Sequence, residues 1–208
     1  MSVDPRPRIN CDWSERPSVS ANLLWRHVDK HYEDSDFSRA VECLRSLIES
    51  GDTLAKVHLG WLMLYGVGLA RDEDQALLLY RAALDTGEVA AAISLAQYFS
   101  VREEWSRARA YYLTAAGMGS LVAAYRLGTR QELKQDDGES ESMAWLEKAA
   151  IGGHVWSVVG LARQQWASHT FRGRAAAIAM VIRAIALMTH GVWQSKKGYW
   201  SFHPRLRK

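Results

Sequence analysis

The 208-residue sequence contains only two cysteines and four prolines. Cys11 and Cys43 are too few for a disulfide framework, and neither lies in a C-x-x-C or Cys/His spacing that would hold a metal ion. This usage favours a reducing compartment. The first residues also lack the apolar run that a secretory signal requires, so we expect a cytoplasmic protein.

Long hydrophobic runs are also missing. The nearest is the segment 175–189, which is interrupted by Arg183 and falls short of the roughly 20 residues that span a bilayer. We therefore expect no transmembrane segment and interpret this run as a buried helix. Because residues 174–188 are almost continuously apolar, the helix either closes the end of the core or meets something outside it.

Acidic residues are absent after Glu147. Residues 1–147 contain 16 Lys and Arg against 23 Asp and Glu, a net charge of −7, whereas residues 148–208 contain ten Lys and Arg and no acid. Such polarity favours an acidic partner for the C-terminal end, whether protein, anionic lipid or nucleic acid. The alternative is that opposite ends of the same molecule or of neighbouring molecules attract each other.

What the sequence does contain is a tandem repeat. Two sets of landmarks recur with the same spacings of 36, 32 and 34 residues. A small residue in the second helix of each pair allows two helix backbones to approach, and a glycine fits the left-handed position that ends this helix. The small residues are Ala40, Ala76, Ala108 and Ser142, and the glycines are Gly51, Gly87, Gly119 and Gly153.

These landmarks predict one repeat domain over residues 20–190. The preceding residues 1–19 hold three of the four prolines and are typical of a flexible arm. The following residues 191–208 form a basic aromatic tail. The predicted helical pairs cover residues 20–51, 54–87, 88–119, 120–153 and 154–190.

The second pair carries the most complete repeat signature. It consists of Ala55-x3-Leu59-Gly60, then Tyr65-Gly66-Val67-Gly68-Leu69-Ala70-Arg71-Asp72, then Ala76-x3-Tyr80-x2-Ala83. This pattern strongly resembles the Sel1-like repeat, a relative of the tetratricopeptide repeat with a longer, glycine-containing loop between its helices. The resemblance covers about residues 36–165, although the third and fourth pairs lack the G-x-G loop.

The resemblance implies an all-α fold, an α-solenoid in which about five antiparallel helical pairs form a right-handed superhelix. It also implies a bacterial adaptor or scaffold that mediates protein–protein contacts, with no reaction chemistry, cofactor or metal. The family is functionally broad, so the resemblance indicates the architecture better than the role.

The residues themselves offer no strong candidate for catalysis or metal binding. The segment Gly66-Val67-Gly68 lacks the further residues of a nucleotide-binding motif, and we interpret it as an interhelix loop. His27 and His31 lie four residues apart, but no third ligand follows at a fixed spacing. Cys43 aligns with large side chains in the other repeats, so we expect it to pack. We therefore predict a protein that is not an enzyme.

A binding surface is predicted from the register of the first helices. In solenoids these helices generally line the concave side. The positions one before and three after the repeat leucine lie one turn apart on the same face, and the position two after it adds to the strip. The resulting strip begins with apolar and aromatic residues and ends in arginines, which would complement a partner with a hydrophobic anchor followed by carboxylates. Its residues are His58, Trp61, Leu62, Gln97, Tyr98, Arg126, Arg130, Arg163 and Gln164.

Three functions follow from these observations. The leading one is an adaptor for a protein or peptide partner, which we expect ahead of a nucleic acid. The second is a surface-association module whose tail, with Trp193 and Trp200 beside Lys196 and Lys197, docks on anionic lipid or nucleic acid. The third is an inhibitor or immunity-type protein that occludes an enzyme.

Overall fold

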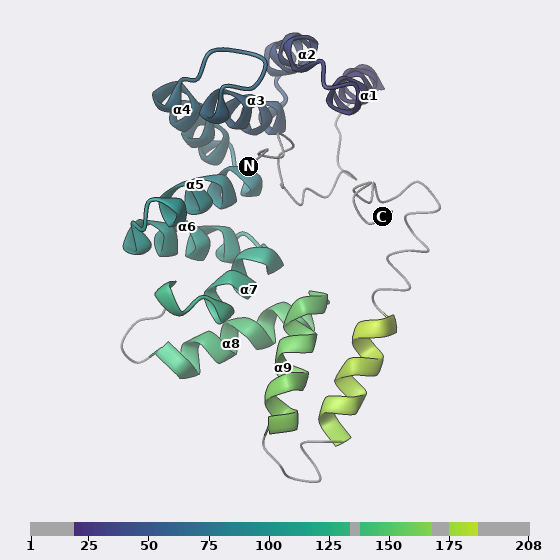
Figure 1. The fold of residues 1–208 in the computed structure, drawn as a ribbon, viewed down its shortest axis with the longest axis vertical. Helices are drawn as coiled ribbons and strands as arrows, with labels where there is room; N and C mark the ends of the chain where they lie inside the picture. Colours follow the sequence, from purple (N-terminus) through teal and green to yellow (C-terminus); the bar gives the residue numbers. More distant parts are fainter. Residues whose placement is uncertain (1–18, 134–137, 168–174, 187–208) are drawn as a thin grey trace. The chain divides into compact units, whose positions relative to one another are not determined.

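The computed structural model describes residues 19–133, 138–167 and 175–186, and every regular element within these ranges is a helix (Figure 1). The chain divides into two compact units, an N-terminal unit up to Tyr111 and a C-terminal unit from Tyr112. The elements are α1 (Val19–Glu33), α2 (Phe37–Glu49), α3 (Thr53–Tyr65), α4 (Glu73–Asp85), α5 (Val89–Val101), α6 (Trp105–Gly117), α7 (Leu121–Thr129), the short 3-10 helix η2 (Gln131–Leu133), α8 (Gly138–Ile151), α9 (Val155–Ala167) and a C-terminal helix over residues 175–186.

The observed helices confirm the predicted helical pairs. Helices α1 and α2, α3 and α4, and α7 and α8 pack against each other as hairpins. Phe99 of α5 stacks on Tyr111 of α6, with ring centroids 5.5 Å apart. Leu161 of α9 shares a core cluster with Ala184 of the C-terminal helix. The chain is therefore all-α over the part that the structure describes, as the repeat pattern predicted.

Each pair is joined to the next by a three-residue junction that ends one helix and begins another. The glycine of the junction has a left-handed backbone, with φ between 88° and 94°. Nothing lies within 4 Å of the Cβ position at Gly51, Gly87 or Gly119, so backbone conformation rather than space favours glycine there. The N–H of the following residue donates to the carbonyl five positions back, at 2.9 or 3.0 Å, and this bond closes the helix end.

The residue after each glycine also caps the next helix. Its side chain accepts a hydrogen bond from a backbone N–H in the first turn, as N-cap residues do. The same type of N-cap therefore occurs four times, each time with a different residue type. The caps are Asp52 (from Ala55 N, 3.1 Å), Glu88 (from Ala90 N, 3.3 Å), Ser120 (from Ala123 N, 3.1 Å) and His154 (from Ser157 N, 3.3 Å).

Glycine and small residues lie where helices of a pair cross, as predicted. A Cβ atom on Gly60 would lie 2.9 Å from the Tyr80 ring and 3.2 Å from the carbonyl oxygen of Ala76. A Cβ atom on Gly128 would lie 2.8 Å from the carbonyl oxygen of Ser142. Because these distances are shorter than van der Waals contact, the two backbones approach this closely only where a side chain is missing.

The glycine-containing loop of the second pair packs against the first pair. Gly66 and Gly68 have φ values of 67° and 75°. A Cβ atom on Gly68 would lie 2.6 Å from the backbone carbonyl carbon of Phe37, and the Ser38 hydroxyl donates to the Gly68 carbonyl at 3.5 Å. These contacts confirm the interpretation of this segment as an interhelix loop, and they explain why both glycines are needed.

The core of the N-terminal unit contains a buried polar contact. The indole N–H of Trp25, which is fully buried, donates to Asp52 Oδ2 at 2.7 Å. The same carboxylate caps α3, so one side chain ties α1 to the start of α3. The His58 ring contacts the rings of Trp25 and Tyr32, with centroid distances of 4.9 Å and 6.3 Å. Burial is also the main reason that the pKa of Tyr32 is raised.

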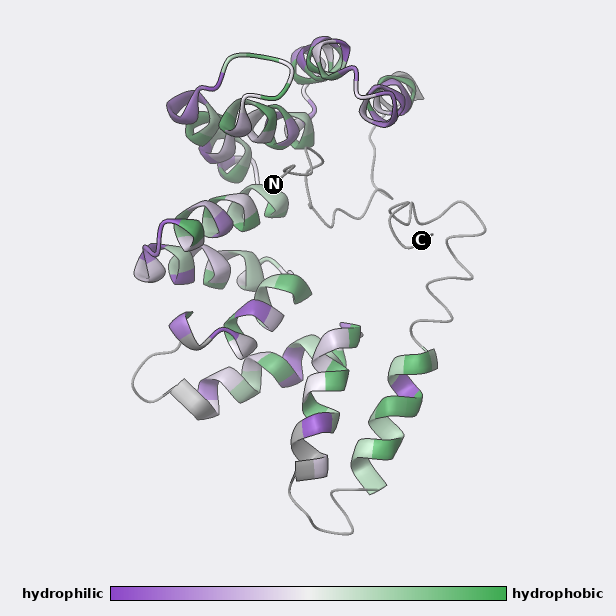
Figure 2. Cartoon of the chain, in the orientation of Figure 1, coloured by the Kyte–Doolittle hydropathy of each residue, from purple (hydrophilic) through white to green (hydrophobic). Residues whose placement is uncertain are grey.

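The C-terminal helix differs from the buried helix that the sequence predicted. Among residues 175–186, only Ala177 and Ala184 are buried, whereas larger apolar side chains such as Ile182 are exposed. Small side chains allow this helix to lie close to α9, and the large ones then point outward. Figure 2 shows the helix as mostly hydrophobic around its visible surface. Residues 187–189 of the predicted run, the predicted arm up to residue 18 and the predicted tail lie outside the described residues.

Candidate protein-binding surface

The predicted strip on the first helices is partly buried in the N-terminal unit. His58 and Leu62 belong to the core, with 3% and 0% of their surface exposed. Trp25 of α1 covers the His58 ring. These two residues therefore hold the helices together and do not provide the contact surface predicted for them, because their face of α3 is covered by the preceding pair.

Other strip residues of the N-terminal unit reach the surface in part. Trp61 is half-buried in α3, and its ring contacts that of Tyr65, which is exposed, at a centroid distance of 4.9 Å. Gln97 is half-buried in α5. An aromatic pair with one accessible edge is a surface that can contact another protein, because such side chains bury large areas on binding.

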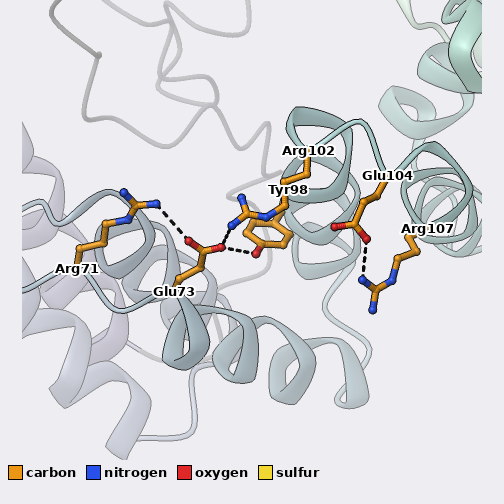
Figure 3. A network of polar contacts seen from close by, with 6 residues as sticks. All are labelled: Arg71, Glu73, Tyr98, Arg102, Glu104 and Arg107. Carbon is orange, nitrogen blue, oxygen red and sulfur yellow. Dashed lines mark hydrogen bonds and ion pairs between the residues drawn. The ribbon is translucent and has the colours of Figure 1, made fainter.

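Tyr98 joins α5 to the start of α4 (Figure 3). Its hydroxyl donates to the Glu73 carboxylate, and Arg102 forms an ion pair with the same oxygen. Arg71 donates to the other Glu73 oxygen at 3.2 Å. The guanidinium of Arg102 also lies 4.4 Å from the centroid of the Tyr98 ring. Tyr98, predicted to contact a partner, is thus half-buried in a network that connects two helical pairs.

A second ion pair lies beside this network. Glu104 accepts a hydrogen bond from Arg107 at 2.7 Å, and this bond is the main reason that the pKa of Arg107 is raised. Arg107 also lies 4.4 Å from the centroid of the Phe99 ring. The pKa of Tyr98 is raised by burial and then by the nearby charges of Glu104 and Asp74. These arginines of the N-terminal unit therefore have carboxylate partners within the chain.

The strip arginines of the C-terminal unit are placed differently. Arg130 and Arg163 are exposed and Arg126 is half-buried. Within the part of the chain that the structure describes, none of these three arginines forms an ion pair. Arg126 and Arg130 lie one turn apart at the C-terminal end of α7, whereas Arg163 lies in α9. Gln164 also belongs to α9, but its side chain is outside the described residues.

His154 is a half-buried histidine beside Arg126. Its Nδ1 atom accepts from the Ser157 backbone N–H and lies 2.9 Å from the Ser157 hydroxyl. Its ring packs on Tyr125, with centroids 4.6 Å apart. Burial, followed by the charge of Arg126, lowers the pKa of His154, because both disfavour the imidazolium form. The neutral ring is the form that caps α9.

An open apolar groove of about 420 Å³ lies between α9 and the C-terminal helix. This groove was not predicted, because the apolar run was interpreted as buried. The spacing of the large apolar residues in the run places them on one helical face, but it does not show that this face is exposed. The groove is lined by Val159, Arg163 and Trp166 of α9 and by Ile178, Val181 and Ile182 of the C-terminal helix, among others.

Two solved structures are similar to this arrangement. One is a Sel1 repeat protein from Oxalobacter formigenes, with a TM-score of 0.61 and 20% identity, covering 80% of this chain and 74% of that chain. The other is a protective antigen of uropathogenic Escherichia coli strains that displays an SLR fold, with a TM-score of 0.57 and 18% identity, covering 78% of this chain and 38% of that chain. The chain has the Sel1-like repeat fold. This confirms the resemblance and the all-α solenoid class predicted from the sequence.

One relative is similar in sequence as well. The chain is 29% identical over 144 residues to the exopolysaccharide production negative regulator of Rhizobium meliloti. The match covers 60% of this chain and 54% of the regulator, so the chain spans about half the length of that relative. No protein-family model matches the sequence.

The structure also bears on Cys43, on metal binding and on membrane spans. Cys43 packs against the N-terminal core, and burial is the main reason that the pKa of its thiol is raised, which fits the packed side chain expected there. The described residues include no cluster of three or more His, Cys, Asp or Glu side chains that could hold a metal ion. None of the described helices is long and apolar enough to cross a membrane.

Proposed function

We propose that the chain is a non-enzymatic, cytoplasmic adaptor that holds a partner protein on the surface of its Sel1-like repeats. Helical repeats present successive helices side by side, which suits them to holding an extended or helical partner. The similarity to a negative regulator supports the proposal, because a regulator can act by holding another protein.

The observation that carries this proposal is the exposed positive charge of the C-terminal unit. Arg130 and Arg163 are exposed and Arg126 is half-buried, and Arg163 lies in the stretch after Glu147 that contains no acidic residue. Arginine binds carboxylates through paired hydrogen bonds, and it is enriched in protein interfaces. An acidic partner protein is therefore the ligand that these side chains favour.

The N-terminal unit would contribute the apolar part of the contact. Trp61 and Tyr65 form an accessible aromatic pair, and Gln97 lies on the next first helix. Tyr98 adds the exposed part of its ring while its hydroxyl holds Glu73. Each unit is therefore proposed to offer its own contact, without the buried His58 and Leu62 and without Gln164, whose side chain is outside the described residues. The residues kept from the sequence prediction are Trp61, Gln97 and Tyr98 in the N-terminal unit and Arg126, Arg130 and Arg163 in the C-terminal unit.

Quantitative affinity capture from the cells that produce the protein tests this function. We expect the double variant Arg126→Glu/Arg130→Glu to recover its main acidic partner about tenfold less than the wild type does, because like charges oppose docking. The double variant Arg45→Glu/Arg81→Glu is the matched control, since it reverses two exposed arginines of the N-terminal unit. Equal recovery by both variants would contradict the proposal.

A second candidate function is association with an anionic surface. It is favoured by the exposed Trp156 and Trp166 in a region that has basic but no acidic residues. We expect this function to show as binding to vesicles of phosphatidylserine and phosphatidylcholine, or to an oligonucleotide, that weakens as salt rises. Removal of residues 191–208 distinguishes a contribution of the tail from one of the described helices.

A further inference from the structure

The C-terminal helix packs with two alanines and Met180 inward and with a stripe of β-branched side chains outward. Ala177 and Ala184 are at most 2% exposed, whereas four β-branched residues are 45% to 63% exposed. The spacing of these four residues, i, i+3, i+4 and i+7, places them in one stripe on the helix. They are Ile178, Val181, Ile182 and Ile185.

Helix α9 carries a second outward stripe beside the first. Trp156 and Trp166 are 65% and 53% exposed, and Val159 and Arg163 lie between them at helical spacing. The groove of about 420 Å³ separates the two stripes, and its lining is apolar except for Arg163. Two parallel ridges with a furrow between them form a surface into which the side chains of a third helix can fit.

The repeat itself indicates what such a surface accepts. In the N-terminal unit, α3 packs on α2, and α5 packs on α4 and α3. In the C-terminal unit, α9 packs on α8. The first helix of each pair thus covers the pair before it. The outer face of the last described pair occupies the position where another helix would pack, yet it is apolar, whereas a terminal capping repeat has a polar outer face.

Charge decides between the possible occupants of this face. Arg163 is the charged residue among those that line the groove, and no acidic residue follows Glu147 in the sequence. A second copy in a symmetric contact would bring two acid-free surfaces together. The chain's own residues 191–208 are also basic and acid-free. Carboxylates on the occupant would complement this face, whereas like charges would oppose docking.

We propose that the outer face of α9 and the C-terminal helix binds an amphipathic helix of a partner protein. The apolar side of that helix fills the groove, and acidic residues on its flank meet Arg163. This is recognition of a helix in a groove, in which the partner presents apolar side chains at i, i+3, i+4 and i+7. The inference rests on the proposed adaptor function and adds the secondary structure and chemistry of the partner.

The first test measures binding of two designed helical peptides to the full chain. Both peptides have about 18 residues and the same leucine stripe, but one carries glutamates and the other lysines on its flanks. Circular dichroism checks that the two are equally helical. At physiological ionic strength we expect the glutamate peptide to bind about tenfold more tightly than the lysine peptide. Equal affinity, or no binding of either peptide, overturns the inference.

Variants then locate the binding face. We expect Ile178→Ser/Ile182→Ser to weaken binding of the glutamate peptide about tenfold, because two apolar contacts are lost. Leu78→Ser is the matched control, since Leu78 is exposed on α4 of the N-terminal unit, and it should leave affinity within about twofold. Arg163→Glu keeps every apolar side chain and should reverse the preference between the two peptides. Unchanged preference in Arg163→Glu overturns the inference even if the serine variant fails to fold.

Other occupants give distinct outcomes, and each of them overturns the inference. A dimer in sedimentation that is lost in Ile178→Ser/Ile182→Ser identifies a second copy. An affinity that rises about tenfold on removal of residues 191–208 identifies the chain's own tail. Vesicles of phosphatidylserine and phosphatidylcholine that bind the wild type but not the serine variant, without peptide binding, identify a lipid surface.

Failure of the inference can be distinguished from failure of the adaptor function. If affinity capture is lost in Arg126→Glu/Arg130→Glu but unchanged in Ile178→Ser/Ile182→Ser, the adaptor function holds and the helix-binding face is wrong. If capture is unchanged in both, the adaptor function itself is contradicted. Loss of capture in the serine variant, together with selective binding of the glutamate peptide, supports both.

Discussion

Among the described residues, the N-terminal unit contains arginine ion pairs and the C-terminal unit contains none. Arg71 and Arg102 share the carboxylate of Glu73, and Arg107 pairs with Glu104. In the C-terminal unit Arg130 and Arg163 are exposed, and the described residues give them no carboxylate partner. Some arginines of the N-terminal unit therefore connect helical pairs, while others, such as Arg45 and Arg81, are exposed like Arg130 and Arg163.

The two units nevertheless share one backbone device. Gly51 and Gly87 of the N-terminal unit and Gly119 and Gly153 of the C-terminal unit all end a helix with a left-handed backbone, and the next residue caps the following helix. The repeated fold therefore depends on these junctions and on the small residues at the crossings. Side chains elsewhere are free to differ, which is how one fold carries arginine ion pairs in one unit and an exposed apolar face in the other.

The largest predicted difference between the units concerns their caps. Asp52 is buried and accepts from both the Ala55 backbone N–H and the Trp25 indole, whereas Ser120 accepts from one backbone N–H. We expect Asp52→Ala to lower the free energy of unfolding by about 2–4 kcal/mol, the sum of a lost cap and a lost acceptor for a buried donor. Ser120→Ala should cost only about 1 kcal/mol.

Urea unfolding followed by circular dichroism measures both losses. Asp52→Asn is the matched control for charge, because its amide oxygen can still accept one of the two hydrogen bonds. It should therefore fall between the wild type and Asp52→Ala. Equal losses for Asp52→Ala and Ser120→Ala would show that the buried indole contact contributes nothing beyond the cap.

Helix ends and helix crossings were predictable from the sequence, because each depends on the type of one residue and on its spacing in the repeat. A glycine at a fixed spacing indicates a helix end, and a small residue in the second helix of a pair indicates a crossing, so Gly119, Ala76 and Ser142 are predicted correctly. The loop at Gly68 was predicted as a loop, but its contact with the Phe37 backbone depends on how two pairs pack, which spacing alone does not encode.

Features that depend on the orientation of a helix were not predictable. His58 and Leu62 share a face of α3, but only the packing of the preceding pair shows that this face is buried. The pairing of Tyr98 with Glu73 depends on the register between α4 and α5. The apolar run at residues 175–186 was correctly predicted as a helix, yet periodicity identifies a stripe without showing whether it faces inward or outward.

The second predicted difference is a pH dependence confined to the C-terminal unit. Because the pKa of His154 is lowered in the folded chain, the unfolded chain binds a proton at higher pH than the folded chain does. The stability from this residue is fully present above about pH 6.5 and is lost as the pH falls through the folded pKa. Protonation of Nδ1 removes the acceptor for Ser157, so we expect a loss of about 1 kcal/mol.

Comparison of the wild type with His154→Asn isolates this effect. Asparagine is a good N-cap residue and does not titrate, so the variant should lose less stability than the wild type between about pH 7.5 and about pH 5.5. Urea unfolding at the two pH values measures the difference, and the NMR titration of the His154 ring gives the folded pKa directly. Identical losses in both proteins would place the pH dependence elsewhere in the chain.

The smallest predicted difference returns to the arginines. Glu73→Gln keeps an oxygen that can accept from Tyr98 but removes the charge that Arg71 and Arg102 share. Since these ion pairs lie at the surface, we expect a loss below about 1 kcal/mol that disappears at high salt. A salt-independent loss in Glu73→Gln would mean that hydrogen bonding, not charge, connects α4 to α5.

Arg126→Glu/Arg130→Glu should change the free energy of unfolding by no more than about 0.5 kcal/mol, because it breaks no ion pair within the described residues. A large loss in the arginine variant would mean that these side chains stabilise the fold and are not reserved for a partner.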